Sequence, residues 1–504
     1  MSQDERRGSM RGSASWWKPL GALGLVGLSL LPAWGATQRP YEGVTLTVIT
    51  QSPPYIAKPV QMFGPAWERR TGGRINLVTT PFGELYQRIM SGFTLGAGGF
   101  DVLIFASAWM GDFAGNRYLL DITERVRADR GLQWDDILPT YQQTVNWGGR
   151  LYGLPVDGDV HLVYYRRDVL SNPRHRQEFQ RRFGRELRPP QTWVEYREIA
   201  EFFQGTDWAG DGRRRYGVLE AFRRGGQAFW FFMSHAAPYV CPPGLKGCLF
   251  FDPDTMRPQI NNPGFVRALE EWTRLVRLGP PGMINFDSGD VRSQFAAGVA
   301  VLAKDWGDTG IVGSTDPKSV VKGRVGTVVL PGSLEVYNYR TRSWTRLSRP
   351  NVAPYLAFGG WVCGVAATTR HPSAAYDFCR TLASPQNSYV AVTTSETGFN
   401  PFRASHFRNL EGWRRFGFVE PDLSSYLTAI ERSLSHPNAQ LDLKLPGQAR
   451  YLDALETQLA RAAAGQATPQ QALDAAAAEW ERITNELGRD RQRRLYRAWL
   501  GLPE

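Results

Sequence analysis

The first third of the chain alternates short apolar runs with amphipathic stretches. Three β-branched runs predict strands, at residues 44–50, 74–80 and 101–106. Between the first two, Val60, Phe63 and Trp67 are spaced to share one face of a helix, and residues 82–93 predict a second helix. This alternation of strand and helix is typical of a parallel sheet with right-handed crossovers. Ligands collect at the carboxyl ends of such strands, which here are residues 51–55, 80–82 and 107–110.

The rest of the chain is richer in helical patterns. Two further helices and two short strands are predicted, at residues 192–203, 263–279, 324–332 and 359–367. A last helix over residues 468–488 begins with a capping box of Thr468 and Gln471 and has Pro469 at its first position. Because 504 residues exceed one ordinary domain, we expect two lobes.

The first 36 residues have the features of a secretory signal peptide. Basic residues precede an apolar run at 19–31 that is too short to span a bilayer, and small residues follow at Ala33 and Gly35. We therefore expect residues 1–36 to be cleaved and the mature chain to be soluble in the periplasm. An uncleaved membrane anchor is the alternative. No lipobox cysteine follows the apolar run.

The four cysteines fit an oxidising compartment. Cys241 and Cys248 flank a turn-rich loop that a disulfide can close. Cys363 and Cys379 lie on a predicted strand and the helix after it, where we expect a second disulfide; two buried free thiols are the alternative. The chain has no CxxC pair and no histidine cluster, so neither a metal site nor a cofactor is expected.

The formal net charge of +11 comes mainly from scattered arginines. A nucleic-acid-binding protein concentrates such charge with aromatic residues on one face. Here the basic runs fall in predicted loops and near the C-terminus, at residues 174–185, 212–217, 223–226 and 489–494. The pattern favours a solvated basic surface and no nucleic-acid partner.

Four segments, taken in order, resemble the extracellular solute-binding proteins (family 1) of bacterial ABC importers, the group that includes maltose-binding protein. They are LYGLPVDGDVHLVYYRRDVL (151–170), QFAAGVAVLAKDWGD (294–308), GGWVCGVAATTRHPSAAYDFCRTLASPQ (359–386) and GFNPFR (398–403). The resemblance covers nearly the whole mature chain. It implies an α/β, two-lobe periplasmic-binding-protein fold, with a ligand cleft between the lobes and hinge crossings near Asp157 and Trp306.

These crossings divide the chain into two discontinuous lobes. We expect lobe 1 to contain residues 37–156 and 306–370, and lobe 2 to contain residues 157–305 and 371–504. The chain is longer than most members of the group, with extra length near residues 241–251 and 336–354.

Trp306 stands between two carboxylates, Asp305 and Asp308, where a strand is predicted to end. A sugar ring has apolar faces and hydroxyl edges, so its site needs flat aromatic surface and a few fixed polar groups. Trp306 would supply the surface and the carboxylates would accept hydroxyl protons. A platform of this kind is partly exposed without ligand, whereas a core Trp is buried. The two carboxylates have a structural alternative as helix caps.

Further candidates surround this stretch. Asp157 and Asp159 form a second acceptor pair, although Asp157 has a structural alternative as a cap. Trp361 follows Gly360, which allows the backbone to approach a ligand. The remaining predicted ligand-binding residues are Ser107, Trp109, Trp230 and Arg403. For the two Trp residues a core position is the alternative, and Arg403 has the alternative of pairing with a carboxylate in the hinge.

The resemblance implies a substrate-binding component that captures a carbohydrate (a sugar, oligosaccharide or polyol derivative) and delivers it to the permease of an ABC importer. It also implies a monomer without catalytic activity. One alternative is an anionic or peptide-like solute, bound through the excess of arginine. The other is a secreted glycoside-acting enzyme with Asp157 and Asp305 as its two carboxylates. The chain has no GxSxG or HExxH motif.

Overall fold

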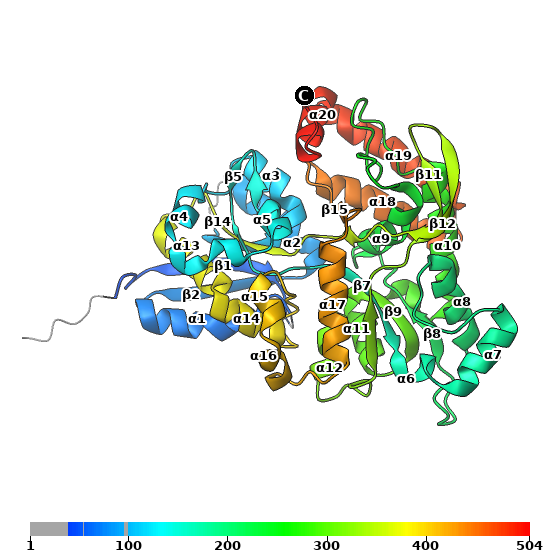
Figure 1. The fold of residues 1–504 in the computed structure, drawn as a ribbon. Coiled ribbons are helices and arrows are strands. Elements are labelled where there is room, and N and C mark those ends of the chain that lie inside the picture. Colours follow the sequence, from blue (N-terminus) through cyan, green and yellow to red (C-terminus); the bar gives the residue numbers. More distant parts are fainter. Residues whose placement is uncertain (1–38, 54, 95–98, 504) are drawn as a thin grey trace, which may run out of the picture.

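The structure is a computed structural model that describes residues 39–53, 55–94 and 99–503. Two separate sheets form the frame of the molecule, and each lies at the centre of one lobe (Figure 1). The predicted signal peptide, residues 1–36, lies outside the described residues. Within the described part of the chain, no helix combines the length and the apolar character needed to cross a membrane.

The first sheet has the strand order β2-β1-β3-β14-β6. Its strands are β1 (Thr45–Gln51), β2 (Arg74–Thr80), β3 (Val102–Ala106), β6 (Leu154–Pro155) and β14 (Trp361–Val365). Strands β1, β2 and β3 run parallel, as the alternating pattern predicted, and β14 is antiparallel to β3 and β6. Every residue of β3 and β14 is buried, which places the core of the first lobe around these two strands.

Helices cover the first sheet. They are α1 (Lys58–Thr71), α2 (Phe82–Thr94), α3 (Met110–Gly115), α4 (Thr123–Ala128), α5 (Pro139–Thr144), α13 (Pro372–Ala383), α14 (Pro385–Thr393) and α15 (Ala404–Arg408), with a small ribbon of β4 (Asn146–Trp147) and β5 (Arg150–Leu151). Helix α1 packs on α13, where the Trp67 indole Nε1 donates to Asp377 Oδ2 over 2.8 Å. Helix α13 also packs on β14, so this part of the chain belongs to the first lobe.

The second sheet has the strand order β10-β7-β9-β8. Its strands are β7 (His161–Arg166), β8 (Tyr216–Leu219), β9 (Ala300–Trp306) and β10 (Val325–Val328). Around it lie α6 (Arg167–Leu170), α7 (Pro173–Phe183), α8 (Trp193–Phe203), α9 (Ala228–Val240), α10 (Pro263–Arg274), α11 (Ser288–Ala296), α12 (Asp308–Thr315) and α17 (Asp422–Leu434). All seven residues of β9 are buried.

The C-terminal helices complete the second lobe. They are α18 (Gln448–Ala463), α19 (Pro469–Glu486) and α20 (Arg489–Trp499). Helices α18 and α19 pack against α9 and α10, and the predicted capping box of Thr468 and Gln471 at the start of α19 is confirmed. A hairpin of β11 (Ser333–Asn338) and β12 (Ser343–Asn351) packs on α9 and accounts for the extra length near residues 336–354.

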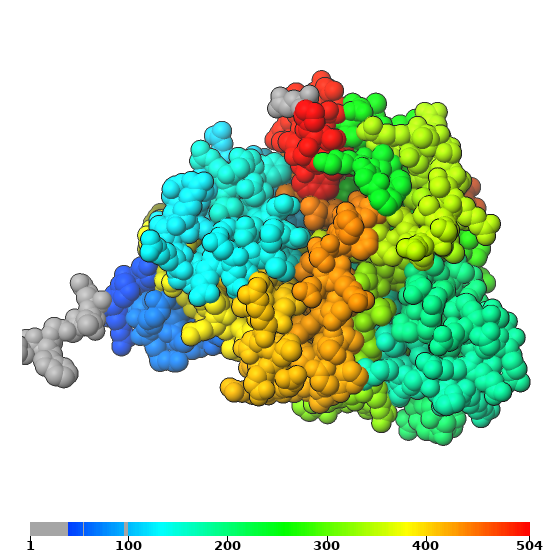
Figure 2. All heavy atoms as spheres, in the orientation of Figure 1, coloured from blue at the N-terminus to red at the C-terminus, as the bar shows by residue number. Residues whose placement is uncertain are grey.

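The chain passes between the two sheets three times. The first passage, residues 156–160, joins β6 to β7, as expected near Asp157. The second joins β12 to β14 through β13 (Tyr355–Leu356), which pairs with β15 (Gln440–Leu441). The third runs from α15 through α16 (Leu410–Arg415) to α17, which lies between the lobes in Figure 2 (orange).

These passages correct two predicted boundaries. The expected crossing near Trp306 is wrong, because β10 follows β9 and pairs with β7 in the second sheet. Residues 306–351 therefore lie with the second lobe. Residues 371–408, expected in lobe 2, lie with the first lobe, because α13 packs on β14 and α1. Local sequence does not show to which lobe either segment belongs, because this depends on the distant strand or helix against which the segment packs.

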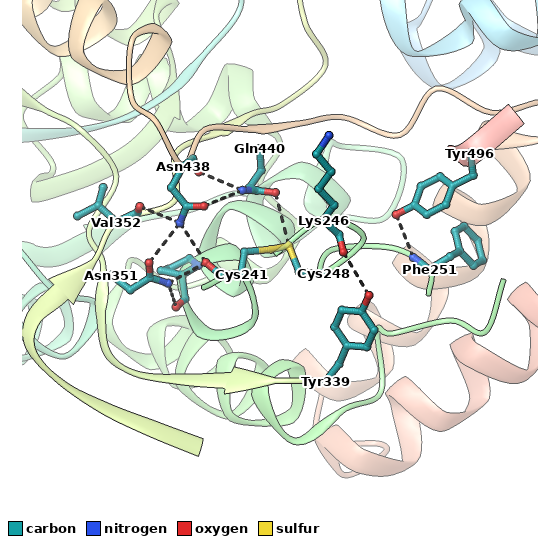
Figure 3. The surroundings of a disulfide bond; sticks show 11 residues. Cys241, Lys246, Cys248, Phe251, Tyr339, Asn351, Val352, Asn438, Gln440 and Tyr496 are labelled. Atoms are coloured by element: carbon teal, nitrogen blue, oxygen red, sulfur yellow. Dashed lines mark hydrogen bonds between the residues drawn. A yellow bond between two sulfur atoms is a disulfide. The ribbon is translucent and has the colours of Figure 1, made fainter. Parts of the chain in front are cut away.

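The predicted disulfide between Cys241 and Cys248 is confirmed, with a Cα–Cα distance of 5.2 Å. Figure 3 shows that Asn438 and Asn351 both donate to the carbonyl of Cys241, each over 3.0 Å, so the loop is tied to two distant segments. The expected second disulfide is wrong, because Cys363 and Cys379 are buried free thiols. Burial and the adjacent Cys379 raise the pKa of the Cys363 thiol, which is therefore neutral in the core of the first lobe.

Candidate functional site

A cavity of about 580 Å³ lies between the two lobes. The first lobe contributes the ends of β1 and β2 and the start of β14, with Gln51, Ser52, Pro53, Tyr55, Pro81, Phe82, Glu84 and Trp361. The second lobe and the passages contribute Asp159, Arg223, Gln227, Asp287, Arg292, Trp306, Asp308, Phe358 and Gly398. Two of the three predicted strand ends thus contribute to the cavity lining, the first through residues 51–53 and 55 and the second through residues 81 and 82. Residues 107–110 do not.

Trp306 closes β9 and lines the cavity, but its side chain is only 2% exposed. Its indole Nε1 donates to Gln227 Oε1 over 2.7 Å, and its ring lies 3.9 Å from the ring of His161. The expectation of a partly exposed Trp is therefore wrong. Trp306 lines the cavity although nearly all of its surface is packed, so it belongs to both the core and the wall.

Phe358 is the aromatic residue that sequence patterns did not identify. Its ring lies 5.4 Å from Trp361 and 5.7 Å from Trp306, and all three line the cavity. Its φ of 63° is unusual for a residue with a side chain. Asp442 holds this conformation by accepting from the Phe358 backbone N–H, over 3.0 Å.

Trp109 and Trp230 stand one layer behind this wall. Trp109 stacks on Phe82 at 5.8 Å, and Trp230 packs edge-on against Phe82 at 6.0 Å. The indole Nε1 of Trp230 donates to Asp442 Oδ2 over 2.5 Å. Neither residue lines the cavity, so neither is placed for its predicted contact with a ligand. Both instead pack behind Phe82, which does line the cavity.

Ser107 and Gly360 also act behind the wall. The Ser107 hydroxyl donates to the carbonyl of Phe358 over 2.5 Å. Gly360 has a φ of 83°, and a Cβ atom there would lie 2.0 Å from the carbonyl oxygen of Asp157. Glycine is therefore required for the first passage to lie against the start of β14. Neither residue lines the cavity.

Arg292 on α11 is the cation at the floor of the cavity. Its Nε donates to Asp305 Oδ2 over 2.9 Å, and its Nη1 lies 3.0 Å from Asp308 Oδ1. The guanidinium carbon lies 4.8 Å from the centre of the Tyr55 ring. Asp308 lines the cavity. Asp305 is fully buried and does not, and burial raises its pKa to about 7 against the lowering effect of Arg292. Asp305 thus orients Arg292 rather than facing a ligand.

Asp157 and Asp159 form a buried carboxyl pair in the first passage. Asp157 accepts from the backbone N–H groups of Gly158 and Asn400, over 2.7 and 2.5 Å, and does not line the cavity. Asp159 does, and its Oδ1 accepts from the Asn400 side-chain amide over 3.2 Å. Burial, and then the charge of Asp157, raise the pKa of Asp159 well above its ordinary value, so the pair retains a proton.

Asn400 joins the two halves of this polar floor. Besides Asp159, its side-chain amide donates to Asp308 Oδ2 over 3.1 Å, and its oxygen accepts from the Tyr426 hydroxyl over 3.1 Å. From the same GFNPFR segment, the sequence analysis predicted Arg403 as a ligand-binding residue. Asn400 is the residue that reaches the site.

Arg403 does not line the cavity, so the prediction that it contacts the ligand is corrected. Its side chain is 0% exposed and donates to the carbonyls of Leu132 and Ala383, over 3.0 and 2.6 Å. It also pairs with Asp136 at 3.4 Å. These partners all belong to the first lobe, so Arg403 ties loops of that lobe together.

The mouth of the cavity carries a second ion pair, between Arg223 and Asp287. The loop after Arg223 is held by Glu456, which accepts from the backbone N–H groups of Gly225 and Phe229 over 2.7 and 3.0 Å. This loop presents Gln227, the partner of Trp306, to the cavity.

A second cavity, of about 520 Å³, lies on the other side of Phe358. It is lined by Ser107, Trp147, Asp442, Lys444 and Trp499, among others. It has two Trp residues but no ion-paired floor comparable to Arg292 and its carboxylates.

Two α/β lobes with an aromatic and polar cavity between them define a solute-binding protein. The chain belongs to the bacterial extracellular solute-binding protein family, whose model matches residues 53–389, more than half of the chain. A probable ABC transporter-binding protein of Deinococcus radiodurans is 22% identical over 408 residues, which cover 80% of this chain and 87% of that protein.

Solved structures have the same two-lobe periplasmic-binding-protein fold. An ABC transporter solute-binding protein of Agrobacterium radiobacter K84 in complex with ribitol has a TM-score of 0.71 and 23% identity, covering 88% of this chain and 100% of that chain. The maltose-bound MalE3 of T. maritima has a TM-score of 0.69 and 19% identity, covering 87% of this chain and 100% of that chain.

Proposed function

We propose that the protein captures a carbohydrate (a sugar, an oligosaccharide or a polyol derivative) in the periplasm and delivers it to the permease of an ABC importer. The observation that carries this proposal is the composition of the cavity wall. The rings of Trp306, Trp361 and Phe358 line the cavity together with the half-buried rings of Tyr55 and Phe82. Asp159 and Asp308 in the same lining offer fixed hydrogen-bond acceptors. The ribitol and maltose bound by structural relatives support the same ligand class.

An anionic solute fits this cavity less well. The arginines that line it, Arg223 and Arg292, are already paired with Asp287 and with Asp305 and Asp308. A phosphate or carboxylate would have to compete with these carboxylates and approach Asp159. The excess arginine noted in the sequence therefore does not translate into an anion site here.

Glycoside hydrolysis is also less well supported. A glycosidase places two carboxylates on either side of the substrate. Asp157 and Asp305, the pair suggested by the sequence, are both fully buried and do not line the cavity. Delivery to a permease, without a catalytic step, is the role we assign. Export by cleavage of residues 1–36 is part of the same proposal.

A thermal-shift screen tests the ligand class. The panel contains ribitol, D-mannitol and maltose, with glucose 6-phosphate and a dipeptide as the anionic and peptide-like alternatives. A solute present at about 100 times its Kd adds about 2.7 kcal/mol of stability, enough to raise the melting temperature by several degrees. Stabilisation by the carbohydrates alone supports the proposal. Stabilisation by the phosphate or the peptide alone, or release of reducing ends from an oligosaccharide, contradicts it.

A further inference from the structure

The charges around the cavity are unbalanced, although the whole chain carries a net charge of +11. Arg292 forms salt bridges with both Asp305 and Asp308, and Arg223 forms one with Asp287. Across the residues that the structure describes, no lysine, arginine or histidine forms a salt bridge with Asp157 or Asp159. Two carboxyl groups in the floor of the cavity, Asp159 and Asp308, and two buried behind it, Asp157 and Asp305, thus share one guanidinium.

Asp159 is the member of this group that is buried, lines the cavity and forms no salt bridge with a described residue. Its side chain is 5% exposed and lines the cavity. Its Oδ1 has one donor, the Asn400 amide at 3.2 Å, which is shared with Asp308. No N–H group of a described residue donates to its Oδ2, and its carboxyl group shares a hydrogen bond with that of Asp157. A carboxyl group in such a place requires either a proton or a cation from elsewhere.

The aromatic wall beside Asp159 also favours a cation. Tyr55 and Trp361 line the same cavity, and aromatic faces attract cations through their quadrupoles, as the Tyr55 ring does with the Arg292 guanidinium 4.8 Å away. A hydroxyl group has one proton to donate to a carboxylate, whereas an ammonium group has three and also brings a positive charge that neutralises the carboxylate.

We propose that the solute is a carbohydrate with a free amine, an amino sugar or an amino polyol, whose ammonium group binds Asp159 while hydroxyl groups bind at Asp308 and Gln227. This inference rests on the proposed function, because it assumes that the cavity holds a carbohydrate. In the empty protein the pair formed by Asp157 and Asp159 retains a proton. The ammonium group takes the place of that proton.

Matched probes test the inference on the unmodified chain. Titration calorimetry near pH 6.5 compares D-glucosamine with D-glucose and with N-acetyl-D-glucosamine, and 1-amino-1-deoxy-D-glucitol with D-glucitol. We expect each free amine to bind at least about tenfold more tightly than its neutral counterparts. Equal or tighter binding of the neutral compounds overturns the inference and leaves the proposed function standing. If no compound of this panel binds while ribitol, D-mannitol or maltose stabilises the protein, the inference is wrong and the proposed function stands.

A variant locates the effect. Asp159→Asn keeps the size of the side chain and should reduce the ratio of amine to neutral affinity to about one, whatever it does to the affinity for the neutral compounds. The matched control is Asp453→Asn, which changes the net charge equally at a side chain that is 62% exposed and outside the cavity. It should keep the preference. A preference that survives in Asp159→Asn means that the ammonium group binds elsewhere, and the assignment of Asp159 is then wrong.

Discussion

Replacing Trp306 by phenylalanine should weaken solute binding beyond what any loss of stability explains. Trp306 is 2% exposed, so alanine would cost about 3–5 kcal/mol of a total unfolding free energy of about 5–15 kcal/mol. Phenylalanine keeps much of the packed ring. It removes the indole N–H that donates to Gln227 Oε1 and the part of the ring system that a six-membered ring cannot replace.

The expected magnitudes follow from these two losses. One hydrogen bond and part of a buried ring are worth about 1–2 kcal/mol of unfolding free energy. A whole aromatic anchor contributes about 2–4 kcal/mol to binding, and losing about half of it reduces affinity roughly 5- to 30-fold.

Trp272→Phe is the matched control. Trp272 is 0% exposed, lies in the same lobe and donates its indole N–H to Glu220 Oε2 over 2.9 Å, but it does not line the cavity. Its replacement should cost at least as much stability, and affinity should change less than about twofold. Calorimetric titration with the best solute of the screen, and urea unfolding of the empty protein, measure the two quantities. Equal affinities in the two variants would show that Trp306 is only a core residue.

Three further predictions concern stability and motion. Burial raises the pKa of Glu456 from 4.5 to about 7. Between these pH values the folded state binds more protons than the unfolded state, so the unfolding free energy falls as pH rises, by on the order of 3 kcal/mol in total at pH 7 and above. Urea unfolding at a series of pH values should show this fall in the wild type and not in Glu456→Gln. The variant with serine at Cys241 and Cys248 should lose about 2.5 kcal/mol of stability on the loop-entropy model, and alkylation of the unfolded, unreduced wild-type chain should label Cys363 and Cys379 alone; labelling at all four sites would contradict the disulfide assignment. Saturating solute should reduce the radius of gyration in small-angle scattering if the lobes close around it, and an unchanged radius argues against hinge closure.

Local sequence was sufficient for most of the first lobe. The strand over 74–80 and the helix beginning at residue 82 match β2 and α2, because strong periodicity and β-branched residues act over a few neighbours. The end of β9 at Trp306 was predicted for the same reason. What local patterns did not reveal is that β10 pairs with β7, because the choice of partner strand depends on residues about 160 positions away.

The same limit applies to the site. Trp306, Trp361, Asp159 and Asp308 were predicted from chemistry and resemblance, and all four line the cavity. Arg292 was not, although it lies two residues before the segment that drew attention to Trp306. Its role arises only when α11 packs beside the end of β9, which brings its guanidinium to two carboxylates.

Asp157 and Asp305 show the opposite error. Both are acidic residues at the expected positions, but the fold buries them fully and turns them toward backbone N–H groups and Arg292. Sequence identifies a carboxylate near a site. Only the packing of neighbouring segments decides whether it faces the ligand or holds the residue that does.

The most direct test of the central claim is a crystal structure of the protein with the tightest-binding solute of the screen. We predict density for the solute in the cavity between the lobes, with its ring or chain against Trp306 and its polar groups at Asp159 and Asp308. Density in the second cavity beside Trp147 and Trp499, with the first cavity empty, would contradict the assignment of the site.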